Sequence, residues 1–83
     1  MGRYSIEFSK KAAKDYGRLP EDYKSLVDLA LYKLTEGLPV DMKPIIGEKD
    51  IYRIRIGKYR ILFTIIDSVV LISSIGSRGD IYK

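Results

Sequence analysis

The sequence predicts an α+β fold, in which two N-terminal helices pack on one face of an antiparallel sheet of about four strands in the order β-α-α-β-β-β. Two observations lead to this prediction. Apolar residues recur at helical spacing within residues 10–37, and they recur at every second position over most of residues 51–75. The chain is 46% apolar, which is enough for one modest core, and its 83 residues are too few for a second core. We therefore expect a single domain over residues 1–83.

The N-terminal half predicts one strand followed by two helices. Residues 3–8, RYSIEF, alternate between apolar and polar side chains, as in a half-buried strand. Ser9 is a suitable N-cap for a short basic helix that ends near Gly17. Pro20 suits the first turn of a second helix, which Gly37 and Pro39 end. We expect its apolar stripe to pack on the sheet rather than to form a dimer seam; the stripe consists of Tyr23, Leu26, Val27, Ala30, Leu31 and Leu34.

The C-terminal half predicts an antiparallel meander. Residues 38–50 contain two prolines and a glycine, so we expect a connecting loop. Three runs rich in β-branched and aromatic residues follow, at residues 51–56, 59–66 and 69–75. The pairs Gly57-Lys58 and Asp67-Ser68 separate these runs and are short enough for tight hairpins.

The composition excludes several classes of chemistry. The chain has no cysteine and no histidine, which rules out disulfides, thiolate nucleophiles, Cys/His zinc sites and imidazole acid–base catalysis. Its acidic residues lack the spacing of metal ligands, and we expect neither a metal nor a cofactor. No apolar run approaches the roughly 20 residues of a membrane span, so we expect a cytoplasmic protein. The net charge of +4 favours polyanionic or acidic partners, among them ribosomal RNA, mRNA, DNA and an acidic protein.

The charged strands allow two interpretations. Arg53 and Arg55 share one face of a strand, and a turn at residues 57–58 can place Arg60 beside Arg55. Like charges at opposed positions destabilise a sheet unless an anion or a carboxylate lies between them. One interpretation is therefore an anion-binding face. The other is an exposed edge that is charged to prevent aggregation, with the arginines paired to Asp50, Asp67 or Asp80.

The hairpin string YRIRIGKYRILFTI and the ending IGSRGDIY resemble the RelE/ParE superfamily of toxins from bacterial and archaeal toxin–antitoxin pairs. The resemblance covers nearly the whole chain, and its most specific parts are Arg-x-Arg-x-Gly-x-Tyr-Arg and Gly-x-Arg-x-x-x-Tyr. It implies a twisted sheet with two N-terminal helices. It also implies a metal-independent, ribosome-dependent endoribonuclease that cuts mRNA in the A site. A cognate RelB-like antitoxin is implied as the partner, and operator DNA is bound only through the antitoxin complex.

By its motifs, the resemblance places the cleavage residues at Arg53, Arg55, Arg60, Arg78 and Tyr82. In such cleavage the 2′-hydroxyl attacks the adjacent phosphate, and cations stabilise the developing charge. We assign Arg60 to the scissile phosphate and Arg78 to the leaving 5′-oxygen, with Arg53 and Arg55 on the RNA backbone. Tyr82 stacks on a base or assists the 2′-hydroxyl. Two further candidates for RNA contact are Lys49 and Lys58.

Two features leave other functions open. The best-known RelE toxins carry lysines where this chain has Arg53 and Arg55, and arginine cannot lose its proton to act as a general base. That role is left to Tyr82, Lys58 or Lys49, or catalysis depends on positioning and electrostatics alone. The superfamily also contains ParE-like toxins that inhibit DNA gyrase and lack the nuclease residues. A basic binding module without catalysis is the third alternative.

Overall fold

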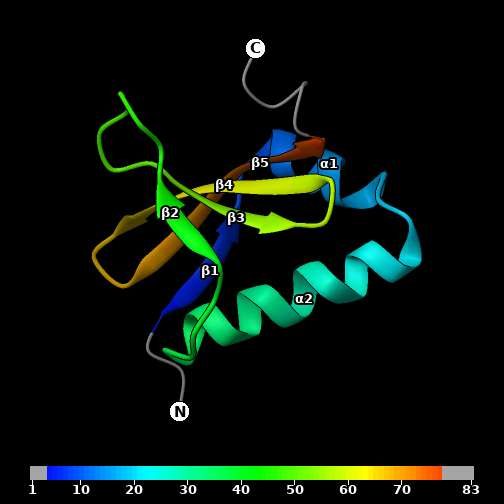
Figure 1. The fold of residues 1–83 in the computed structure, drawn as a ribbon, viewed down its shortest axis with the longest axis horizontal. Coiled ribbons are helices and arrows are strands. Elements are labelled where there is room, and N and C mark those ends of the chain that lie inside the picture. Colours follow the sequence, from blue (N-terminus) through cyan, green and yellow to red (C-terminus); the bar gives the residue numbers. More distant parts are fainter. Residues whose placement is uncertain (1–3, 78–83) are drawn as a thin grey trace.

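The computed structural model describes residues 4–77, so the predicted site residues Arg78 and Tyr82 lie outside the described residues. The elements in chain order are β1 (Ser5–Phe8), α1 (Lys10–Gly17), α2 (Glu21–Thr35), β2 (Met42–Pro44), β3 (Tyr52–Ile56), β4 (Tyr59–Ile66) and β5 (Val69–Ser77). Figure 1 shows α2 running along the sheet and α1 beside the end of β5. The predicted α+β class is confirmed. Neither of the two helices in residues 4–77 is long and apolar enough to cross a membrane.

The sheet differs from the prediction in two ways. It has five strands in the order β1-β5-β4-β3-β2, because residues 42–44 of the expected loop form the edge strand β2. The sheet is also mixed, since β1 pairs with β5 in parallel. Pro44 is tolerated in β2 because an edge strand has one side without ladder hydrogen bonds. The alternation in residues 3–8 indicates a strand but carries no information on the direction of its pairing.

The core lies between the two helices and one face of the sheet. The helices contribute Ala12, Val27, Leu31 and Leu34, all of them buried. The strands contribute Ile54, Ile56, Ile61, Phe63, Val70, Ile72 and Ile75. The predicted stripe of α2 is confirmed only in part, because Leu26 stays 47% exposed. Leu29 and Tyr32 are exposed as well, so α2 presents apolar side chains on both sides.

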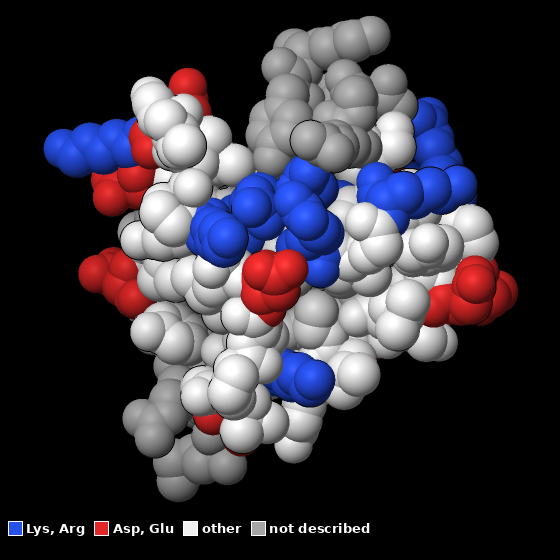
Figure 2. Space-filling view, in the orientation of Figure 1, with Lys and Arg blue, Asp and Glu red and all other residues white. Residues whose placement is uncertain are grey.

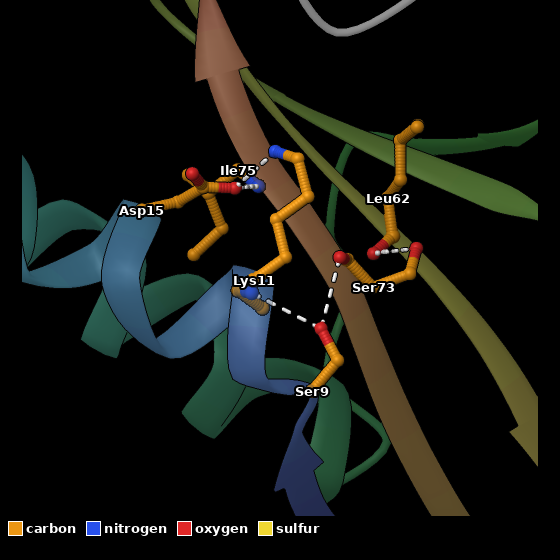
Figure 3. A network of polar contacts seen from close by, with 7 residues as sticks. Ser9, Lys11, Asp15, Leu62, Ser73 and Ile75 are labelled. Carbon is orange, nitrogen blue, oxygen red and sulfur yellow. Dashed lines mark hydrogen bonds and ion pairs between the residues drawn. The ribbon is translucent and has the colours of Figure 1, made fainter.

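Helix α1 covers the edge of β5 beyond the point where β1 ends. Strand β1 pairs with β5 only as far as Phe8, which lies opposite Ile72. From there the Ser9 hydroxyl donates a hydrogen bond of 3.0 Å to the carbonyl of Ser73 and accepts one of 3.0 Å from Ala12 N–H, as the predicted N-cap (Figure 3). The helix thereby satisfies backbone groups that an open strand edge leaves unpaired.

The Asp15 carboxylate makes the second contact of α1 with this edge. Its Oδ2 accepts hydrogen bonds from the Ile75 N–H at 3.0 Å and from Lys11 Nζ at 2.8 Å (Figure 3). Burial acts to raise the pKa of Asp15, but the bonds from Lys11 and Ile75 outweigh it and leave the pKa below its ordinary value of 3.8. The ionised carboxylate therefore fastens α1 to β5.

Strand β5 contains a bulge, which accounts for the break in the alternation of its apolar residues. Leu62 pairs with Ser74 and Phe63 pairs with Ile72, which leaves Ser73 as an extra residue. The Ser73 hydroxyl donates to the carbonyl of Leu62 at 3.1 Å. Because the bulge shifts the alternation by one position, Ile72 and Ile75 are both buried although they are three residues apart.

The two predicted hairpin turns are confirmed. Gly57 and Lys58 join β3 to β4, and Asp67 and Ser68 join β4 to β5. Gly57 has a φ of +57°, and a Cβ at this position would lie 2.9 Å from the hydroxyl of Tyr23. The ring of Tyr23 also meets that of Tyr59 edge to face, with centroids 4.6 Å apart. Helix α2 thus packs directly on the β3–β4 turn.

Candidate nucleic-acid interface

Four cationic side chains gather on the sheet face that the helices do not cover. Strand pairing places Lys43 opposite Arg53 and places Arg55 opposite Arg60. Opposed residues share a face, as do residues two apart on one strand, so all four lie together. Figure 2 shows Lys and Arg side chains clustered in the region where Figure 1 draws β3 and β4. We call Lys43, Arg53, Arg55 and Arg60 the cationic face.

The arginines of the cationic face differ in exposure. Arg55 is exposed, Arg53 is half-buried, and Arg60 is only 5% exposed. Within residues 4–77, Lys43, Arg53 and Arg55 take part in no ion pair, so neither Asp50 nor Asp67 pairs with Arg53 or Arg55. Asp80 lies outside the described residues. The positive charge of Lys43, Arg53 and Arg55 is therefore available to a ligand.

Arg53 adds a buried donor to this charge. Its Nη1 is buried and has no hydrogen-bond partner among the described residues. A buried donor without a partner costs about 1–3 kcal/mol, and a charged one costs more. A phosphate or carboxylate oxygen at this point would satisfy it, and guanidinium groups bind such oxygens through paired N–H donors. The geometry of the cationic face therefore suits an anion.

The structure separates the two lysines that were predicted to contact RNA. Lys49 precedes β3 in the loop after β2, whereas Lys58 lies in the turn that follows β3. The intervening extended residues place them roughly 20 Å apart, at opposite ends of the strand. Neither belongs to the cationic face.

Lys43 is a candidate that the sequence analysis missed. It was assigned to a loop, because three residues that end in a proline carry no strand pattern. Its place on the cationic face follows only from the pairing of β2 with β3, which puts it beside Arg53. The sequence shows a lysine shortly before the hairpin motif, but it does not show which strand that lysine lies beside.

The sequence matches known proteins along almost its full length. Residues 6–82 match the family model described as the ParE toxin of the type II toxin–antitoxin system parDE. The chain is 30% identical over 87 residues to the candidate toxin RelE1 of Methanocaldococcus jannaschii, and the alignment covers 98% of this chain and 97% of that protein.

Solved structures share the fold. A chain of the RelB–RelE antitoxin–toxin complex from Methanococcus jannaschii has a TM-score of 0.79 at 26% identity, covering 90% of this chain and 93% of that one. A chain of the RelBE2 toxin–antitoxin complex from Mycobacterium tuberculosis has a TM-score of 0.75 at 30% identity, with 92% and 99% covered. Fold and relatives together define a RelE-like toxin of a type II toxin–antitoxin system. Within that class, the chain belongs to the ParE toxin family.

Proposed function

We propose that this toxin is a ribosome-dependent endoribonuclease that cleaves mRNA in the ribosomal A site and so stops translation. The observation that supports the proposal best is the cationic face, where Arg55 lies opposite Arg60 and where Arg53 and Arg55 have no carboxylate partner within residues 4–77. Cleavage through the 2′-hydroxyl requires positioned cations rather than histidine or a metal. The resemblance of the hairpin motif to RelE toxins agrees with this chemistry. We propose that residues 1–83 form one toxin domain.

The proposed reaction is an internal transfer of the phosphate. The 2′-oxygen of a ribose forms a bond to the adjacent phosphorus, and the bond from phosphorus to the 5′-oxygen breaks. The products are a 2′,3′-cyclic phosphate and a 5′-hydroxyl, which receives a proton. Negative charge builds on the non-bridging oxygens in the transition state, and guanidinium groups placed there lower the barrier.

The cationic residues have separate roles in this proposal. Arg60 binds the scissile phosphate, and Arg53 and Arg55 hold the RNA backbone and share the developing charge. Because Arg60 is only 5% exposed, a phosphate that contacts it must displace the groups that cover it. Arg78 stabilises the leaving 5′-oxygen, and Tyr82 stacks on a base or assists the 2′-hydroxyl. Lys49 and Lys58 also contact the RNA.

The proton of the 2′-hydroxyl requires an acceptor other than arginine. The guanidinium group of arginine stays protonated in proteins. The family resemblance favours Tyr82, with Lys58 and Lys49 as the other groups considered. Of these, Lys58 is nearer to the cationic face, since it lies in the turn that joins Arg55 to Arg60.

We further propose that a cognate RelB-like antitoxin neutralises this cytoplasmic toxin. The two solved complexes contain a toxin together with its antitoxin. Acidic side chains of the antitoxin would pair with the cationic face and block entry into the ribosome. Binding of operator DNA is assigned to the complex through the antitoxin.

A second function has support from one observation. The family model that matches residues 6–82 is that of the ParE toxin. ParE-like toxins inhibit DNA gyrase, and the fold is common to both kinds of toxin. The decision therefore depends on the arginines and on Tyr82 rather than on the fold.

The test is primer extension on an mRNA held in purified ribosomes with an empty A site. We expect cuts within the A-site codon that require the ribosome and fade with Arg60→Ala and Tyr82→Phe. EDTA-treated RNA without ribosomes is the control. If folded protein at saturation leaves the message intact, the nuclease proposal fails. Inhibition of gyrase supercoiling would then indicate the ParE-like function, and salt-dependent RNA binding alone would indicate a binding module.

A further inference from the structure

A cavity on the helix side of the sheet carries a second group of cations. It has a volume of about 520 Å³, which is within the range of small-ligand pockets. It lies between α1 and the ends of β4 and β5, next to the β3–β4 turn. Helix α1 contributes Lys11 and Asp15, the residues just after it contribute Arg18 and Leu19, and the turn contributes Lys58. The strands add Tyr59, Ile75, Gly76 and Ser77.

The acidic residue of the cavity offsets only part of its positive charge, since Asp15 pairs with Lys11 and also attracts Arg18. Three cations face one carboxylate, and Asp15 already accepts bonds from Lys11 and from the Ile75 N–H. Within residues 4–77, the exposed side chains of Arg18 and Lys58 take part in no ion pair. The cavity therefore has an excess of positive charge next to the end of β5.

The cavity and the cationic face occupy opposite sides of the same strand end. Tyr59 lines the cavity, and Arg60, the next residue, belongs to the cationic face. Consecutive residues of a strand point to opposite faces. The two cation groups are thus separated by the thickness of the sheet and are joined around the turn that holds Lys58.

We propose that this cavity is a second phosphate-binding site and that it holds the backbone of the RNA bound by the cationic face. The inference rests on the proposed function for the identity of the ligand, because a chain of phosphates can reach both sides of the strand end. Arg18 supplies paired donors for a phosphate, and Lys58 supplies a compact charge. Contacts of this kind carry no sequence information, and they fix the register of the RNA on the protein.

The test is binding of a 2′-O-methyl RNA oligonucleotide, which the toxin cannot cleave, measured by fluorescence anisotropy over a range of salt concentrations. The double variant Arg18→Ala/Lys58→Ala removes the two exposed cations and leaves the Lys11–Asp15 pair intact. We expect weaker binding and a salt slope that is smaller by about 1.4, because each lost contact to single-stranded nucleic acid removes about 0.7. The control Lys10→Ala/Lys14→Ala removes two cations of α1 outside the cavity and should leave the slope unchanged. Equal slopes for wild type and the cavity variant would overturn the site.

Inorganic phosphate serves to distinguish the source of the ligand. It is titrated into the full chain, and the amide resonances of Lys58 and Gly76 are followed by NMR. Displacement of bound phosphate by the oligonucleotide would support the RNA backbone as the ligand of the cavity. Phosphate that binds and is not displaced by the oligonucleotide would overturn that assignment. The ribosome assay is independent of this result. If the salt slope falls in the Arg18→Ala/Lys58→Ala variant but the ribosome assay shows no cleavage, the phosphate site stands and the nuclease proposal fails. If the assay shows cleavage but the slope is unchanged, the nuclease proposal stands and the phosphate site fails.

Discussion

Arg55 and Arg60 lie directly opposite each other on adjacent strands, as cross-strand partners of the β3–β4 hairpin. Two like charges in this position destabilise a sheet by about 0.2–1 kcal/mol. The two-residue turn fixes their register, and Tyr23 packs against that turn. The fold thus holds two like charges side by side, where one phosphate could contact both.

The variant Arg55→Gln should therefore be more stable than the wild type and less active. We expect the free energy of unfolding to rise by about 0.2–1 kcal/mol at low salt, because the charge opposite Arg60 is removed. The gain should shrink at high salt, since ions screen the repulsion in the wild type. Urea unfolding at two ionic strengths measures both effects. Lys49→Gln, which removes an exposed loop cation, is the control, and a loss of stability in Arg55→Gln would contradict the argument.

The β3–β4 turn should tolerate no side chain at Gly57. Gly57→Ala places a Cβ 2.9 Å from the Tyr23 hydroxyl and forces a φ of +57° on alanine, so we expect a loss of about 1–3 kcal/mol in urea unfolding. Gly17→Ala is the matched control, because its Cβ would meet nothing within 4 Å at the end of a helix, and it should be neutral or stabilising. Adding Tyr23→Phe to Gly57→Ala should recover part of the loss. An unchanged unfolding midpoint in Gly57→Ala would refute the close contact.

The parts of the fold that the sequence could predict are those with a local cause. Ser9 caps α1 and the Gly57-Lys58 turn closes its hairpin as expected, because capping and turn formation depend on a few adjacent residues. The parallel pairing of β1 with β5 and the strand β2 could not be predicted. Both depend on contacts between segments that are distant in sequence. Alternation shows which face of a strand is buried, but it does not show which strand pairs with it.

The candidate site shows the same division. The hairpin motif predicted that Arg55 and Arg60 could meet, and their pairing is confirmed. Lys43 was missed because its position depends on the pairing of β2 with β3. The exposure of Leu26 was also missed, since helical spacing shows which side of a helix is apolar but not how much of that side the sheet covers. Arg78 and Tyr82 stay predictions.

Lys43 should contribute to RNA cleavage as a member of the cationic face. Lys43→Ala removes an exposed side chain of an edge strand, so stability should change by less than about 0.5 kcal/mol. Loss of one charge-assisted contact to phosphate, worth about 1.5 kcal/mol or more, should lower the rate of A-site cleavage by about tenfold. Lys33→Ala on α2 is the comparison. Equal cleavage rates for these two variants would remove Lys43 from the interface.

The contact between α1 and β5 should weaken in acid. The pKa of Asp15 lies below its ordinary value of 3.8 in the folded protein, because the bonds from Lys11 and Ile75 outweigh the opposing effect of burial. A depressed folded pKa means that the stabilisation is fully present above pH 3.8 and is lost as the pH falls through the folded pKa. Asp15→Asn should therefore cost about 1–3 kcal/mol at neutral pH, and its difference from wild type should shrink below pH 3.8. Urea unfolding from neutral to acidic pH measures this, with the exposed Asp41→Asn as control. A difference that stays constant with pH would show that the Asp15 charge has no part in fastening the helix.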